Sequence, residues 1–120
     1  MSRARSSRPE AIRLADIVGA IDRIDRYRRA LLDEGDEGGG ELVRDATLYN
    51  LVVIGEAVKA LSKDVTAKAP QIPWRDIVGL RNFVAHEYFD IDPELIAQVM
   101  NVQLHELRAA VIGLLRDLRA

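Results

Sequence analysis

The chain has 120 residues, which is enough for one domain with a single core and too few for two. Hydrophobic residues make up 48% and charged residues 30%, the balance of a soluble globular protein. No apolar run approaches the roughly 20 residues of a membrane span, and no apolar stretch follows the N-terminal arginines as in a secretory signal. The absence of cysteine excludes disulfides and thiolate metal sites and fits a cytoplasmic protein. With only two histidines, no metal cofactor is expected.

The net charge of −2 does not indicate nucleic-acid binding, but the charge is unevenly distributed. Eight arginines face four acids through Arg29, whereas six acids face Arg44 alone between residues 33 and 45. A basic arm at residues 1–9 and the helix after it could therefore contact a phosphate backbone. The alternation of arginines with acids favours the other interpretation, a solvated helix face with ion pairs such as Asp22–Arg26.

The first predicted helix starts near Ser7. Ser7 and Glu10 have the spacing of a capping box, in which the serine caps the helix and the glutamate follows three positions later. Apolar residues then recur at helical spacing until an acidic, glycine-rich loop at residues 33–40. We therefore expect a flexible basic arm at residues 1–9 and a helical domain over residues 10–120.

The second predicted helix runs from about residue 41 to residue 62. Between Leu48 and Ala57 it is apolar on nearly every side, which predicts a central bundle helix, a dimer interface, or both. Gly55 costs about 1 kcal/mol relative to alanine in a helix, so its presence predicts the close approach of another backbone.

The rest of the chain also has a helical pattern. A short helical turn is expected at residues 64–69, and a long helix from Trp74 through Tyr88. Asp92-Pro93-Glu94 predicts the start of a last helix, which carries one apolar face formed by Ile96, Met100, Leu107, Val111, Leu114 and Leu118. Because no stretch alternates with a period of two, the predicted fold is all-α: an antiparallel bundle of four main helices with a short extra helical turn.

The residues best suited to chemistry lie between residues 72 and 92. Arg81 falls on the apolar stripe of its helix, where a charge needs a partner or a water-filled cleft. His86 follows five residues later, about 140° around an ideal helix. The two converge only through the reach of the arginine, a loosened helix end, or a second subunit. An arginine that grips a phosphate and a histidine that moves protons would suit cleavage of RNA.

The spacing alone favours a structural alternative. In it, His86 caps the end of its helix while Arg81 pairs with Glu56 or Asp76. His105, in the last helix, is expected to be an ordinary surface or interface histidine.

A larger pattern favours the catalytic interpretation. The chain resembles the HepT-like branch of the HEPN superfamily over about residues 10–118. The resemblance is carried by Asn50, Ile54-Gly-Glu-Ala57, Leu61-Ser62, Ile72-Pro-Trp74 and the motif Arg81-Asn82-x3-His86-x-Tyr88. One departure is that Met100 and Leu104-His105 stand where a tryptophan and a Leu-Pro pair are often found.

The resemblance implies an α-helical homodimer whose motif residues line a cleft between the subunits. It also implies a metal-independent endoribonuclease, the toxin of a type II or type VII toxin–antitoxin pair, that cleaves RNA. By motif match, Arg81 and His86 are catalytic, Asn82 and Glu56 are auxiliary, and Tyr88 is the modification site. The implied antitoxin is a small MNT-type nucleotidyltransferase that silences the toxin by transferring AMP to Tyr88.

Two other functions stay open at this stage. The chain could be a non-catalytic helical partner or substrate of the nucleotidyltransferase, with a polar cleft that binds a nucleotide. The acidic net charge and the imperfect alignment of Arg81 with His86 favour this alternative. A dimer that serves only for interaction is the third possibility.

Overall fold

The computed structural model describes residues 3–34, 39–87 and 103–119. They form helices α1 (Arg3–Glu34), α2 (Gly39–Lys59), α3 (Lys63–Thr66), α4 (Trp74–Val78), α5 (Leu80–Glu87) and α7 (Leu104–Arg119). No strand occurs in these ranges, which confirms the predicted all-α fold. Among the described helices, none is long and apolar enough to cross a membrane.

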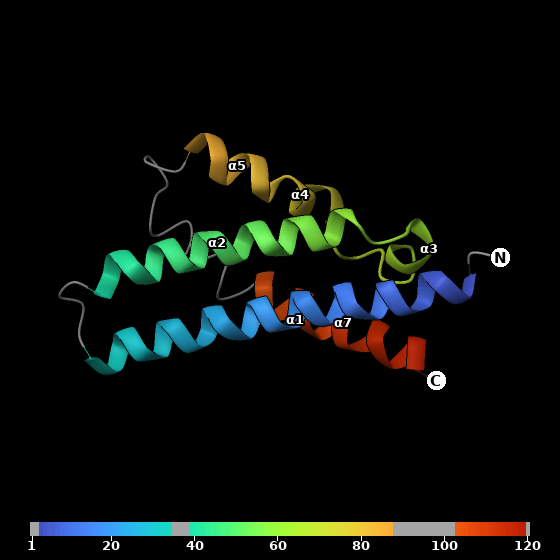
Figure 1. The fold of residues 1–120 in the computed structure, drawn as a ribbon, viewed down its shortest axis with the longest axis horizontal. Coiled ribbons are helices and arrows are strands. Elements are labelled where there is room, and N and C mark those ends of the chain that lie inside the picture. The colour runs from blue at the N-terminus through green and yellow to red at the C-terminus, as the bar shows by residue number, and fades with distance from the viewer. Residues whose placement is uncertain (1–2, 35–38, 88–102, 120) are drawn as a thin grey trace.

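The long helix α2 is central, as its apolar sequence predicted. It runs antiparallel to α1, while α4 and α5 lie along its other side and α7 packs against α1 (Figure 1). Because α2 has neighbours on two sides, it must be apolar over most of its circumference. The predicted bundle of main helices is therefore present, with α3 as the short extra turn.

The core lies where α1, α2 and α7 meet. Leu14, Ile17 and Ile24 of α1 are fully buried, as are Ile54 of α2 and Val111 of α7. Full burial of each large aliphatic side chain contributes roughly 1.5–3 kcal/mol. The apolar face predicted for the last helix is confirmed for the buried Leu107, Val111 and Leu114. The residues predicted to precede them on that face, Ile96 and Met100, lie outside the described ranges.

The helix start predicted at Ser7 is wrong, because α1 begins at Arg3 and includes residues of the predicted arm. Glu10 does not serve as a capping-box residue. The residue is only 7% exposed, and its carboxylate accepts hydrogen bonds from the Ser62 backbone N–H at 3.1 Å and from Ser62 Oγ at 3.3 Å. A buried carboxylate needs such donors, so Glu10 ties α1 to the turn after α2.

Gly55 confirms the predicted close approach of another backbone. A Cβ added at Gly55 would lie 3.1 Å from the carbonyl oxygen of Ile77 and 3.4 Å from the backbone nitrogen of Arg81. The missing side chain of α2 therefore lets α4 and α5 lie directly against it. This contact fixes the position of the Arg81 backbone, from which the Arg81 side chain projects.

The helix predicted from Trp74 through Tyr88 is divided into α4 and α5 at Gly79. The backbone stays right-handed helical there (φ −69°, ψ −11°), and the Phe83 N–H donates to the Gly79 carbonyl at 2.9 Å. The two segments therefore follow one nearly continuous helical path. Tyr88 and the predicted restart at residues 92–94 lie outside the described residues.

Trp74 anchors the start of α4 to the turn around α3. Its indole Nε1–H is shared between the carbonyl oxygens of Thr66, at 3.1 Å, and Ala69, at 2.9 Å. Ser62 caps α3 by accepting from the Val65 N–H. The Ile-Pro-Trp segment therefore has a structural role, because it fixes the position at which the α4–α5 segment begins.

Two acids of α1, Asp22 and Asp25, pair with α7 rather than with α1 itself. Asp22 accepts two hydrogen bonds from Arg108, at 2.8 and 3.3 Å, so the predicted Asp22–Arg26 pair is wrong. The hydrogen bond that Arg108 donates to Asp22 raises the pKa of Arg108 above its ordinary value. His105, an exposed residue of α7 as expected, lies 3.7 Å from Asp25. These contacts hold α7 to α1 outside the apolar core.

Candidate functional site

Arg81 lies at the start of α5 and pairs with a carboxylate of α2. Its Nε is 3.0 Å from Glu56 Oε1. Glu56 adjoins Gly55, whose close contact with α4 and α5 brings the two side chains into range. The Arg81–Glu56 pairing considered in the sequence analysis is thus confirmed. Both side chains remain about half exposed, at 59% and 45%, so water screens the pair and an incoming anion can reach it.

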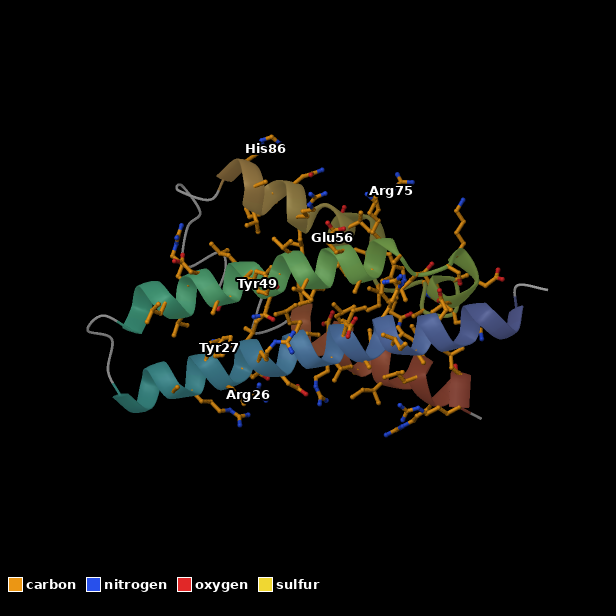
Figure 2. The ribbon with its side chains drawn as sticks, viewed as in Figure 1. Arg26, Tyr27, Tyr49, Glu56, Arg75 and His86 are labelled. Carbon is orange, nitrogen blue, oxygen red and sulfur yellow. The ribbon has the colours of Figure 1, made fainter. Side chains whose placement is uncertain are left out.

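His86 lies in the last turn of α5 and points away from α2 (Figure 2). It is exposed and forms no hydrogen bond or ion pair with another described residue, so the predicted capping contact is not seen in the described part of the chain. Arg81 is directed toward Glu56 on α2. The structure therefore brings Arg81 together with Glu56 and leaves His86 on another side of α5.

Of the two remaining motif residues, Asn82 lies within the described ranges and Tyr88 does not. Asn82 is exposed and has no partner among the described residues. Tyr88, the predicted modification site, lies outside the described ranges. The described motif residues Arg81, Asn82 and His86 thus come from a single short helix and share access to solvent.

Sequence reasoning missed the role of Asn50. This residue of α2 is only 2% exposed, and its Nδ2 donates to the Ala46 carbonyl at 2.8 Å while its Oδ1 accepts from Arg23 Nε at 2.9 Å. The signal was present in the sequence, because a polar residue in an otherwise apolar helix segment needs a buried partner. Only the fold identifies Arg23 of α1 as that partner.

A cavity of about 290 Å³ between α4 and the start of α7 was also not predicted. Its wall is mostly apolar, with Asp76, Gln103 and Glu106 as polar members. Neither Arg81 nor His86 lines it. No group of three side chains suited to holding a metal ion occurs within the described ranges.

These observations define an all-helical bundle in which one short helix, α5, carries the exposed residues Arg81, Asn82 and His86. The Gly55 contact and the Arg81–Glu56 ion pair hold this helix against α2. The sequence of residues 17–113 matches the model of a family described as "Ribonuclease HepT-like". The chain belongs to this HepT-like ribonuclease family.

Relatives agree with the family assignment. The chain is 30% identical over 95 residues to "Probable ribonuclease HepT" of Thermococcus cleftensis, covering 79% of this chain and 86% of the relative. It is 29% identical over 98 residues to "Putative RNase MJ1380" of Methanocaldococcus jannaschii, covering 82% and 89%. A second protein of that organism, "Putative RNase MJ0125", is 29% identical over 88% of this chain and 90% of its own length. No solved structure matches the chain.

Proposed function

We propose that this protein is a metal-independent endoribonuclease, the toxin of a toxin–antitoxin pair, and that it cleaves cytoplasmic RNA with Arg81 and His86. The observation that carries the proposal is the exposed His86 imidazole, which has no described partner and follows an arginine held in place by Glu56. An imidazole that is open to solvent and has no described partner is available for proton transfer. Membership of the HepT-like ribonuclease family supplies the reaction class.

The proposed cleavage reaction needs no reactant besides the RNA and the side chains of Arg81 and His86. The imidazole of His86 takes the proton from a 2′-hydroxyl, and the 2′-oxygen attacks the neighbouring phosphorus. The bond from phosphorus to the 5′-oxygen breaks, and the imidazolium returns a proton to that oxygen. The products are a 2′,3′-cyclic phosphate and a free 5′-hydroxyl. Arg81 stabilises the added charge on the phosphorus oxygens, an effect typically worth about 3–4 kcal/mol.

A homodimer would complete this site. Arg81 and His86 lie on different sides of α5, so we propose that one subunit supplies the arginine and the other supplies the histidine. A surface for the second copy is available on α2. There Leu42 and Tyr49, at 72% and 68% exposure, recur at seven-residue spacing with Glu56 and so share its side of the helix. Burial of these side chains would favour association.

We further propose that a small nucleotidyltransferase is the antitoxin and that it modifies Tyr88. The phenolic oxygen of Tyr88 would attack the α-phosphorus of ATP and release pyrophosphate. The attached AMP would place a negative phosphate two residues from His86, where it would compete with the RNA. Mass spectrometry should find the addition on the unaltered protein and not on Tyr88→Phe.

The test of the ribonuclease is cleavage of RNA by the purified protein in the presence of a chelator, with mapping of the product ends. We expect cyclic phosphate ends and a loss of at least about a hundredfold in rate for His86→Ala. His105→Ala, at the other exposed histidine, is the matched control and should cleave normally. If the protein accepts AMP yet neither cleaves RNA nor is toxic without its partner, the non-catalytic alternative replaces the ribonuclease.

A further inference from the structure

Arg75, Asn82 and His86 share the outward face of the α4–α5 segment. They are separated by seven and four residues, the spacings that return a helix to the same side. The helical path persists through Gly79, so this register holds across the junction of α4 and α5. Figure 2 shows Arg75 and His86 pointing to the same side of the molecule, away from α2. Arg81, by contrast, faces Glu56.

These three side chains have unused hydrogen-bonding capacity. All are exposed, and none forms a hydrogen bond or ion pair with another described residue. Arg75 makes no ion pair with Asp76, although the two residues are adjacent in sequence. An arginine without a carboxylate partner offers its planar set of N–H donors to an external anion, and phosphate fits that geometry.

We propose that Arg75 binds a backbone phosphate of the RNA a few nucleotides from the one cleaved at His86. This inference rests on the proposed ribonuclease function and adds a substrate-positioning residue that acts in binding. Eleven residues separate Arg75 from His86, about 16 Å along the helix axis, so the two contact different phosphates of one strand.

A neighbouring aromatic residue favours single-stranded RNA over a protein as the occupant of this face. Phe83 follows Asn82 directly and is 41% exposed, which makes its ring available for stacking on a base. A cation for the backbone and an exposed ring for the bases are the usual combination in single-strand binding sites. The exposed polar side chains of Asn82 and His86 near Phe83 do not favour a hydrophobic protein contact.

The test measures binding apart from cleavage. A fluorescent single-stranded 2′-O-methyl RNA of mixed sequence lacks the attacking hydroxyl, so the unaltered protein can bind it without cutting it. Fluorescence anisotropy over a range of salt concentrations should show about tenfold weaker binding for Arg75→Ala. The slope of log affinity against log salt should become shallower by about 0.7, as expected for one lost phosphate contact.

Controls separate this contact from general effects of charge. Arg116→Ala removes an exposed arginine without a described partner from α7 and should bind the RNA normally. Arg75→Lys keeps the charge and should recover part of the affinity. Size-exclusion chromatography with light scattering should give the same oligomeric state for all of these proteins.

Three results would overturn the inference: unchanged RNA affinity in Arg75→Ala, an equal loss in Arg116→Ala, or a loss accompanied by a change in oligomeric state. The last result would make Arg75 a protein-contact residue. Failure of the ribonuclease proposal looks different, because the unaltered protein would then leave natural RNA intact while Arg75→Ala still weakened binding to the analogue.

Discussion

Glu56 of α2 and Arg81 of α5 are joined by an ion pair of 3.0 Å at the point where Gly55 brings the two helices into contact. The carboxylate limits the orientations that the guanidinium can adopt, at a position that remains open to solvent. A screened pair of this kind adds little to stability, typically about 0–1 kcal/mol. Its larger effect should be on the placement of Arg81.

The first prediction concerns Glu56→Gln, which removes the charge and keeps the shape of the side chain. We expect RNA cleavage to fall about tenfold, the cost of loosening one group in a catalytic arrangement. The free energy of unfolding should change by less than about 1 kcal/mol. Rates measured at saturating RNA, together with urea unfolding curves, would test both statements. Asp117→Asn, at an exposed carboxylate of α7, is the control, and an equal rate loss there would contradict the role given to Glu56.

The second prediction contrasts two helical glycines. Gly55→Ala should destabilise the fold by about 1–2 kcal/mol, because the new Cβ would lie 3.1 Å from the Ile77 carbonyl oxygen and push α4 and α5 away. Gly113→Ala should stabilise by about 0.5–1 kcal/mol, since nothing lies within 4 Å of its added Cβ. Thermal unfolding of both variants would show the contrast. Stabilisation by both substitutions would mean that α2 and the α4–α5 segment do not approach so closely.

The third prediction concerns the buried Glu10. Glu10→Gln replaces a charged acceptor that binds the Ser62 N–H and hydroxyl, and should cost about 1–2 kcal/mol of stability. Asp16→Asn removes an exposed carboxylate of the same helix that has no described partner, and should cost almost nothing. Denaturant titration of the pair provides the comparison. Equal midpoints for the two variants would show that the Glu10–Ser62 contact is energetically unimportant.

The fourth prediction concerns the bidentate contact between Asp22 and Arg108. A double-mutant cycle with Asp22→Asn and Arg108→Gln should give a coupling free energy of about 0.5–1 kcal/mol, because both side chains are partly exposed. The coupling should decrease as salt is added. A coupling of zero at low salt would assign the attachment of α7 entirely to its apolar face.

Much of the fold could be predicted because hydrophobic spacing determines which faces are buried. The central position of α2, the close contact at Gly55 and the buried face of α7 all follow from local pattern. The predictions failed where a local motif competed with a partner distant in sequence. Glu10 had a capping-box spacing, but Ser62 supplied better donors, and Asp22 paired with Arg108 instead of Arg26.

The candidate site was also predictable in part, because the spacing of residues along a helix determines which of them face the same side. The motif spacing identified Arg81, Asn82 and His86, and the 140° between Arg81 and His86 already predicted that a straight helix would not bring the two together. The spacing could not show which of its two possible partners Arg81 takes, Glu56 or Asp76, because that depends on how the helices cross. It also gave no reason to connect Arg75 with His86, which becomes evident once α4 and α5 are seen to follow one path.

The proposed sharing of one site between two subunits is tested most directly by mixing inactive variants. Arg81→Ala and His86→Ala should each be nearly inactive alone. A mixed dimer should contain one site with both residues intact, so unfolding and refolding the two together should restore RNA cleavage. If verified mixed dimers stay inactive, or if either variant alone cleaves RNA at the original rate, Arg81 and His86 do not form a catalytic site across subunits.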